Sequence, residues 1–493
     1  MISLKTQLEK AIAGQRALIY LLCTEESRVL PILSKIAGER NCSMETWSCI
    51  KGLSGTGIKE KTEGAVAAIK SIMGGGKKGI YAFQDLSEFL EDPEVKRALR
   101  EFNQSPAAGT GQFLVIVSPE LKIPETLREE IHLIDVPPPD DEEISAEFNR
   151  IRLMYPESRI PVEFHADIML SLKGLSISGI GSILQRIFKA DSTGKEAVFN
   201  EIFDEKETII KKTGYLEFTP PRALMANIGG LGNLKEWLIK REKTFSREAI
   251  EAGVQPPKGL LMMGISGCGK SLAVKAISSL WKMPLFRLDM NLVFSGLYGS
   301  PEATFHKALQ TVGAVAPAIL WIDEIENALG LEEEGGLTIS SHIFSSFLTW
   351  MQEKPPLIFI AATANKIQAL PAEIIRKGRF DQVFFVDLPD EMERREIFTI
   401  YIASNGGDIA KFDLKMLSIM TNGWNGAEIA QVVSAARTDA HYENRAFTQG
   451  DISANINTTV PLSTTMESQI KNIRNWALSR ATPASKNARI LRY

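Results

Sequence analysis

The sequence predicts an α/β protein of two modules, each with a mostly parallel sheet covered by helices. Short apolar runs alternate with amphipathic stretches through the C-terminal half, which is typical of strand–helix–strand units. A glycine-rich loop stands between a predicted strand and a predicted helix of that half. The N-terminal half repeats this rhythm, with proline and glycine at similar places. The chain has 493 residues, more than one hydrophobic core normally serves, so at least two domains are expected.

The composition excludes several classes of protein. Hydrophobic residues make up 44% of the chain and charged residues 24%, as in ordinary globular proteins. The 56 basic and 60 acidic residues leave a net charge of -4, which gives no overall field for nucleic acid or an anionic membrane. Four cysteines without a CxxC pair and five histidines without ligand spacing disfavour a metal–cysteine site. The longest early apolar run, Leu18–Cys23, is too short for a signal peptide or a membrane span.

Prolines and changes in the spacing of apolar residues divide the chain into four parts. A charged stretch ending in Pro220-Pro221 suggests a linker, and the pattern turns helical after Pro389. The expected parts are a front module at 1–205 with a helical lid at about 151–200, a linker at 206–225, a large α/β domain at 226–390, and a helical lid with a C-terminal tail at 391–493. The strands expected in the large domain are Gly259–Met263, Leu285–Leu288, Ala318–Ile322, Leu357–Ala361 and Val383–Val386.

A phosphate-binding loop follows the first of these strands. Residues Gly264–Ser271 match G-x-x-x-x-G-K-[ST] in full and precede a predicted helix, Leu272–Leu280. Glycines in such a loop let backbone N–H groups wrap phosphates at a helix N-terminus. The motif predicts Lys270 on the β- and γ-phosphates of ATP and Ser271 on Mg²⁺. The nucleotide-binding residues expected here are Gly264, Ile265, Ser266, Gly267, Cys268, Gly269, Lys270 and Ser271.

Two carboxylates end the strand Ala318–Ile322. Asp323 is expected to hold Mg²⁺ through its water shell, and Glu324 to act as general base on the attacking water. A strand ending in Asp-Glu is usually a solvated strand end, but its place behind a phosphate loop makes this one specific.

Polar residues after the next strand complete the expected catalytic set. Asn365 would place the water beside the γ-phosphate. Arg376 and Arg379 would be offered to a neighbouring subunit's γ-phosphate, where a planar guanidinium stabilises transition-state charge. The alternative for the two arginines is an ordinary basic surface loop.

Residues 226–493 resemble the AAA family, in its clade of protein-remodelling ATPases. The motifs that carry the resemblance are Ile228-Gly229-Gly230, Pro256-Pro257-Lys258-Gly259, Ile375–Asp381 with Lys377 where proline is usual, and Gly426-Ala427. The resemblance implies ATP and Mg²⁺ as cofactors, with Ile228, Gly229, Gly426 and Ala427 flanking adenine. It also implies Arg376 and Arg379 as inter-subunit fingers and a homo-oligomer, a hexameric ring when active.

The family's central-pore loop has its counterpart in Leu297-Tyr298-Gly299. A ring of Tyr298 side chains would grip an extended polypeptide, which implies a protein substrate; a tyrosine buried in the core is the open alternative. Over its whole length the chain resembles AAA proteins of unknown substrate from cyanobacteria and algal plastids. We therefore expect it in the cytoplasm, or in the plastid stroma if a plastid encodes it, and few cysteines agree with a reducing compartment.

The front module parallels the C-terminal one in sequence. The matching segments, in order, are Ile80–Leu90 with Ile319–Leu329, Ile123–Arg128 with Leu370–Arg376, Asp135–Asp140 with Asp387–Asp390, and Gly174–Gly179 with Gly423–Gly426. Their common order favours a duplication over chance similarity.

The front module lacks the chemistry of its counterpart. Gln84 stands in the place of Asp323, and no glycine or lysine follows the first strand. Glu25 and Glu26 stand there instead and would repel phosphate. We therefore expect a degenerate AAA-like module that binds no nucleotide.

Cys268 lies inside the phosphate loop. Backbone amides, the helix N-terminus and Lys270 would together favour its thiolate, which predicts a lowered pKa and fast alkylation. A small residue that fills a tight loop is the alternative interpretation.

The predicted function is ATP hydrolysis coupled to remodelling of a protein partner. An ATP-gated protein-binding switch or scaffold with low turnover is the alternative. A nucleic-acid motor is disfavoured because the sequence has no basic stripe.

Overall fold

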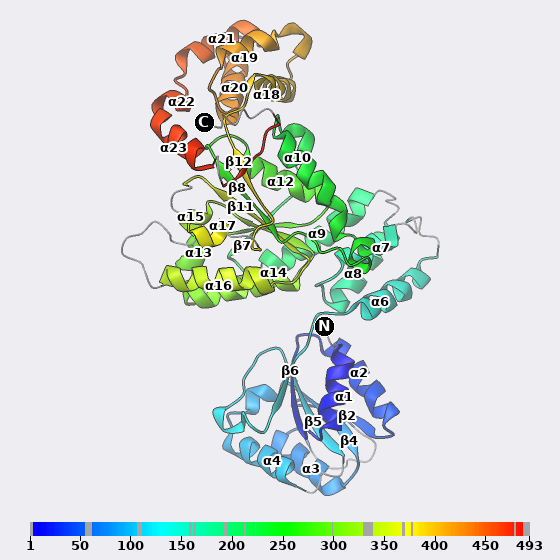
Figure 1. Cartoon of the computed structure of the whole chain (residues 1–493). Helices are drawn as coiled ribbons and strands as arrows, with labels where there is room; N and C mark the ends of the chain where they lie inside the picture. Colours follow the sequence, from blue (N-terminus) through cyan, green and yellow to red (C-terminus); the bar gives the residue numbers. More distant parts are fainter. Residues whose placement is uncertain are drawn as a thin grey trace. The chain divides into compact units, whose positions relative to one another are not determined.

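The chain forms two compact units in the computed structural model (Figure 1). The first contains residues 1–150 and 176–181, and the second contains residues 151–175 and 182–493. The structure describes residues 3–54, 62–105, 111–156, 160, 164–190, 195–211, 213–221, 223–297, 299–328, 339–366, 370–375, 378–477 and 480–486.

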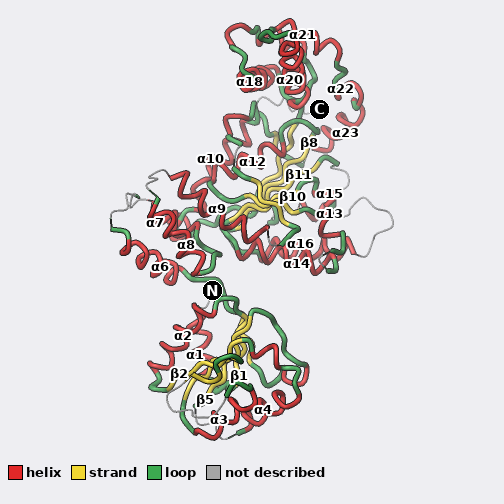
Figure 2. Tube along the Cα trace, turned by 180° about the vertical axis from the view of Figure 1, so that it is seen from behind, coloured by secondary structure: helices red, strands yellow, loops and turns green. Residues whose placement is uncertain are grey.

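The first unit is built on a six-stranded sheet with the order β3-β2-β4-β5-β1-β6. Its neighbours pair in parallel, apart from the antiparallel β2 and β3. The strands are β1 (Leu18–Leu22), β2 (Ser43–Ser48), β3 (Gly52–Ser54), β4 (Gly79–Gln84), β5 (Gln112–Ser118) and β6 (His132–Asp135). Helices lie on both faces (Figure 2): α1 (Leu4–Ala13) and α2 (Glu26–Glu39) cover one, and α3 (Ala65–Gly75) and α4 (Pro93–Gln104) cover the other. The next helix is α6 (Asp141–Met154).

The second unit is built on a seven-stranded sheet with the order β13-β12-β8-β11-β10-β9-β7. The strands are β7 (Leu216–Thr219), β8 (Gly259–Gly264), β9 (Leu285–Leu288), β10 (Ala318–Ile322), β11 (Ile358–Ala364), β12 (Gln382–Val386) and β13 (Thr482–Pro483). One face packs against α14 (Pro301–Ala314) and α16 (Ile339–Glu353), and the other against α10 (Gly232–Arg241) and α12 (Lys270–Trp281). Only the antiparallel β7, on the edge beside β9, breaks the parallel pattern among the described strands. All five strands predicted for this sheet are confirmed within a few residues.

The second unit has further helices. They are α7 (His165–Ser171), α8 (Ile177–Lys189, whose first turn belongs to the first unit), α9 (Lys195–Lys211), α11 (Arg247–Glu251), α13 (Met290–Phe294), α15 (Ile325–Ala328) and α17 (Ala372–Ile375). Of these, α9, α13, α15 and α17 contribute buried residues to the core on the α14 and α16 face. The lid helices are α18 (Glu391–Ser404), α19 (Leu414–Met420), α20 (Gly426–Tyr442) and α21 (Gln449–Thr458), and the tail contains α22 (Leu462–Thr465) and α23 (Glu467–Ala477).

The two sheets share one core topology, as the duplicated sequence pattern predicts. In β6-β1-β5-β4-β2 and in β12-β8-β11-β10-β9 the strands follow the same order along the chain. Asp85, directly after β4, and Glu324, the second residue after β10, both have left-handed backbones, with φ of 53° and 48°. Non-glycine residues rarely adopt this conformation. The predicted fold class is therefore confirmed: a parallel α/β module with a helical lid follows a related α/β module.

The same helix start recurs after the last core strand of each module. Asp140 and Glu143 exchange side-chain-to-backbone hydrogen bonds of 3.0 Å at the start of α6. Asp390 and Glu393 do the same at the start of α18, at 2.8 and 3.1 Å. This reciprocal capping fixes where each helix begins.

The described residues of the predicted linker, 206–211, 213–221 and 223–225, lie in the second unit. They contain the end of α9 and all of β7, which pairs with β9. Lys206 is fully buried, and its ammonium donates to the carbonyls of Val315 (2.8 Å) and Pro317 (3.4 Å) at the C-terminal end of α14. Burial lowers the pKa of Lys206 to about 7. The two carbonyls satisfy the buried ammonium, and the neighbouring Ile210, Tyr215 and Leu216 join the hydrophobic core of the second unit, so this stretch is docked through apolar packing. The compact units also differ from the predicted division of the chain, since residues 151–175 and 182–205 belong to the second unit.

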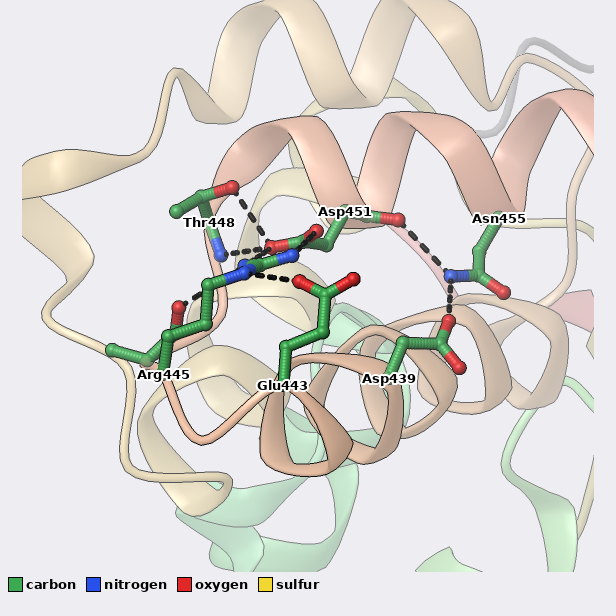
Figure 3. A network of polar contacts seen from close by, with 7 residues as sticks. Asp439, Glu443, Arg445, Thr448, Asp451 and Asn455 are labelled. Atoms are coloured by element: carbon green, nitrogen blue, oxygen red, sulfur yellow. Dashed lines mark hydrogen bonds and ion pairs between the residues drawn. The ribbon is translucent and has the colours of Figure 1, made fainter.

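The lid has a polar joint between α20 and α21 (Figure 3). Arg445 donates two hydrogen bonds of 2.7 Å to the two carboxylate oxygens of Asp451. Asp451 also accepts from the backbone N–H of Thr448 at 2.8 Å, and Asn455 bridges to Asp439 on α20 at 3.0 Å. The hydrogen bonds from Arg445 hold the pKa of Asp451 well below its usual range. The two helices are thereby fixed to each other at the end of the lid where α20 finishes.

Candidate functional site

A cleft of about 400 Å³ lies in the second unit, between the C-terminal ends of parallel strands and the lid. This is where open parallel sheets bind ligands, and the volume suits a nucleotide-sized molecule. Its lining comes from the loop after β8, the ends of β10 and β11, the segment before α10, and the helices α18 and α20: Asn227, Ile228, Gly229, Leu231, Ser266, Gly267, Cys268, Gly269, Lys270, Ser271, Leu272, Asp323, Glu324, Thr363, Asn365, Asp387, Pro389, Glu393, Ile397, Ile400, Tyr401, Gly426 and Ala427.

The glycine-rich loop joins β8 to α12, as predicted. Lys270 is buried, and its ammonium donates to the carbonyls of Gly264 (2.9 Å) and Ile265 (2.8 Å) beneath the loop. Burial lowers the pKa of Lys270 to about 8, against the opposing charges of Asp323 and nearby groups. Gly267 has a φ of 76°, and a Cβ there would come within 2.8 Å of Asn425. Only glycine therefore lets the loop approach the lid this closely.

Ser271 and Asp323 face each other across the floor of the cleft. The hydroxyl of Ser271 lies 3.4 Å from Oδ1 of Asp323, which also accepts a hydrogen bond from Thr363. Hydroxyl and carboxylate oxygens suit Mg²⁺ when nucleotide phosphates and water supply its other ligands. Within the described part of the chain no cluster of three or more His, Cys, Asp or Glu is placed to hold a metal. The oxygens of Ser271 and Asp323 fit a magnesium ion whose other ligands come from a nucleotide and water.

Glu324 is held by two amides. The side chain of Asn365 donates to Glu324 Oε1 at 2.7 Å, and that of Asn327 donates to Oε2 at 2.8 Å. The backbone N–H of Glu324 donates to the Thr363 hydroxyl at 3.0 Å, so Thr363 links both carboxylate residues to β11. A carboxylate fixed at the cleft wall in this way is suitably placed to accept a proton.

Residues predicted to flank adenine line the lid side of the cleft. Gly229 packs so closely against α18 that a Cβ would come within 2.6 Å of Ile397. The backbone N–H of Ala427, in the first turn of α20, donates to the carbonyl of Gly267 at 3.0 Å. The lid and the phosphate loop are thus in direct contact, and Ile228 and Gly426 line the cleft beside this contact.

Some predicted residues lie outside the cleft. Tyr298 and Arg376 fall outside the described residues. Arg379 donates to the carbonyl of Glu373 and is not among the cleft-lining residues. Gly264 and Ile265 contribute carbonyls beneath the loop rather than cleft surface.

The prediction for Cys268 is wrong. Burial raises the pKa of its thiol to about 12, with only partial opposition from Lys270. We therefore expect maleimide at pH 7 to label the exposed Cys49 much faster than Cys268, because only the thiolate reacts quickly. Mass spectrometry of the labelled peptides gives both rates in one sample. Labelling of Cys268 as fast as Cys49, and blocked by ATP, would contradict the neutral thiol.

Sequence reasoning missed two residues that organise the site. Thr363 bridges Asp323 and the backbone of Glu324, and Glu326 binds the backbone at Asn365. Both are close in sequence to predicted residues, Glu326 in Asp-Glu-Ile-Glu and Thr363 in Thr-Ala-Asn. Their proximity to the predicted residues was the available signal, but a threonine or glutamate at such a place can equally be an ordinary polar residue of the core.

The matching position in the first unit is filled by the chain's own carboxylates. Glu25 Oε1 accepts from the backbone N–H of Ser178 at 3.2 Å, in the first turn of α8, where Ala427 stands in α20. Glu26 accepts a hydrogen bond from Gln84, the counterpart of Asp323. Acidic side chains thus hydrogen-bond to Ser178 and Gln84 at this position, and the absence of nucleotide binding in the first unit stays a prediction.

Comparisons with known proteins agree with this geometry. Residues 260–388 match the family described as ATPase family associated with various cellular activities (AAA). Residues 4–136 match the N-terminal domain of SpoVK-like AAA ATPases. None of the described helices has the length and apolar character needed to cross a membrane.

The similarity to known proteins extends over nearly the whole chain. The chain is 38% identical over 400 residues to the uncharacterized AAA domain-containing protein ycf46 of Pyropia yezoensis, covering 81% of each chain. It is 34% identical over 485 residues to the ycf46 protein of Gracilaria tenuistipitata var. liui, covering 97% of this chain and 98% of that one. The human ATPase family gene 2 protein homolog A is 30% identical over 228 residues, which are 44% of this chain and 25% of the human one. Because the similarity to the ycf46 proteins extends over both units, this chain belongs to the AAA ATPase family and groups with the ycf46 proteins, and its residues 4–136 form a SpoVK-like N-terminal domain.

Proposed function

We propose that the protein hydrolyses ATP with Mg²⁺ in the cleft of the second unit. The observation that carries the proposal is the convergence of Lys270, Asp323, Glu324 and Asn365 on one cleft. Lys270 and the amides of the loop would bind the phosphates, and Ser271 with Asp323 would hold magnesium. When bound, the ion would neutralise charge on the β- and γ-phosphates.

Glu324 would accept the proton of the attacking water, and Asn365 would orient that water and the carboxylate together. The 2.7 Å contact between them supports this pairing. Ile228, Gly229, Gly426 and Ala427 would enclose the adenine, since they line the cleft and Gly229 packs against α18 of the lid.

Hydrolysis would be coupled to remodelling of a protein partner by a homo-oligomer, a hexameric ring in the active form. Membership of the AAA family supports the ring, and Arg376 with Arg379 would reach the neighbouring subunit's nucleotide. Tyr298 would contact the polypeptide substrate. The ycf46 relatives come from algae, which supports the plastid stroma or the cytoplasm of a related cell as the site of action.

The test is ATP turnover by the purified protein, measured as phosphate release, together with affinity capture of partners by the Glu324→Gln variant in ATP. Turnover that is stimulated by a captured protein would support remodelling. ATP binding with negligible turnover and nucleotide-dependent capture would favour the alternative, an ATP-gated binding switch.

We expect one nucleotide per chain. Calorimetry should give a stoichiometry near one, and Lys270→Ala should remove nearly all binding, because Glu25 and Glu26 occupy the matching donors of the first unit. Lys307→Ala, which changes an exposed lysine of α14, is the matched control and should bind normally. A second site that survives Lys270→Ala would contradict the assignment of the first unit.

A further inference from the structure

Glu326 is a buried carboxylate that the proposed chemistry does not use. It lies on α15, two residues after Glu324, and is 0% exposed. Its Oε1 accepts from the backbone N–H of Asn365 at 2.7 Å and from that of Lys366 at 2.9 Å. Its Oε2 is buried, with no hydrogen-bond partner among the described residues. Burying a carboxylate costs free energy of folding, so the position of Glu326 requires an explanation beyond its two hydrogen bonds to the backbone after β11.

Asn365 connects those bonds to the site. Its backbone is held by Glu326, while its side chain donates to Glu324 Oε1 at 2.7 Å. The Glu324–Glu326 turn therefore binds both the backbone N–H and the side-chain amide of Asn365. Glu324 itself has the left-handed φ of 48°, a conformation that the surrounding contacts must maintain.

Asn327 shows how the turn is closed from the other side. Its backbone N–H donates to the carbonyl of Glu324 at 2.9 Å, and its side chain to Glu324 Oε2 at 2.8 Å. Glu324 is thus fixed between Asn327 in its own turn and Asn365 on the neighbouring strand. Of these two supports, only Asn365 depends on a carboxylate outside the cleft.

We propose that Glu326 is a positioning residue for hydrolysis, which holds the backbone of Asn365 so that the amide keeps Glu324 aimed into the cleft. The inference rests on the proposed ATPase function and assigns Glu326 no contact with substrate. A capping role alone would affect the stability of the turn; a positioning role affects turnover through Asn365.

The experiment compares Glu326→Ala, Glu326→Gln, Asn365→Ala and the double variant Glu326→Ala/Asn365→Ala in the full chain. We expect Glu326→Ala to lower kcat about 10²-fold, as small misplacements of catalytic groups do, with KM and the affinity for ADP changed by less than about 3-fold. Glu326→Gln should retain most of the activity, because its amide oxygen still accepts both N–H bonds. The double variant should be no slower than Asn365→Ala, since non-additivity marks residues that act through one another.

Three controls separate the outcomes. Glu353→Ala, at an exposed glutamate of α16, should match the wild type, and thermal unfolding of each variant reports folding. Unchanged kcat in Glu326→Ala, or losses that multiply in the double variant, would overturn this proposal while leaving the ATPase function intact. A folded wild-type chain that binds ATP without hydrolysing it would instead overturn the proposed function, and this inference with it.

Discussion

Replacing Arg376 by alanine is expected to reduce ATP turnover of the assembled protein by about 10³–10⁵-fold, while a single chain binds ATP with nearly unchanged affinity. A guanidinium supplied by a neighbour acts on the charge of the transition state and contributes little to the ground state. The second candidate, Arg379, is not among the residues that line the cleft of its own chain. A residue that acts on the nucleotide of a neighbouring subunit is expected to lie outside its own cleft. Phosphate release and nucleotide titration on the same preparations measure the two quantities.

Mixing gives the decisive control for a shared site. Arg376→Ala chains keep an intact phosphate loop, and Lys270→Ala chains keep the arginine, so mixed assemblies should recover part of the activity. Arg97→Ala, at an arginine that is 69% exposed in the first unit, should have normal turnover. Verified mixed assemblies without any recovery would show that the arginine does not act across an interface.

Replacing Glu324 by glutamine is expected to lower kcat by about 10²–10⁴-fold and to leave ATP binding intact. The amide preserves the shape of the side chain and can still meet Asn365 and Asn327, but it cannot accept a proton. The measurement is single-turnover hydrolysis alongside equilibrium binding, which separates the chemical step from affinity.

Glu353→Gln makes the same chemical change at an exposed position of the second unit and should behave as the wild type. Near-normal turnover in Glu324→Gln would remove Glu324 from the mechanism. Loss of ATP binding would assign the carboxylate to the binding step instead.

The strands of both modules and the phosphate loop could be predicted because their signals are local. Apolar runs such as Ala318–Ile322 become buried strands almost without change, and the loop motif requires a strand before it and a helix after it. The likeness of the two modules could also be predicted, since proline and glycine recur at similar places in both while the catalytic residues do not. The strand order that the two sheets share then followed from their common fold.

What the sequence did not reveal depends on partners distant along the chain. Lys206 looked like part of a charged linker, but its carbonyl partners lie more than 100 positions away, at Val315 and Pro317. β13 is only two residues long, and it is a strand because it pairs with β12 at the edge of the sheet. The pKa of Cys268 was predicted in the wrong direction because the motif shows the favourable charges and hides the burial that outweighs them.

Glu25, which accepts a hydrogen bond from Ser178, occupies the matching position of the front module from within the same chain. A carboxylate attached to the chain has an effective concentration that dilution does not change. On the proposed function, the C-terminal cleft would alternate between ATP and ADP, whereas the contacts of Glu25 and Glu26 would keep the front module out of the nucleotide cycle. An attempt to restore nucleotide binding to the front module by engineering would therefore have to remove Glu25 and Glu26 first, since adding glycines and a lysine would leave two tethered competitors in place.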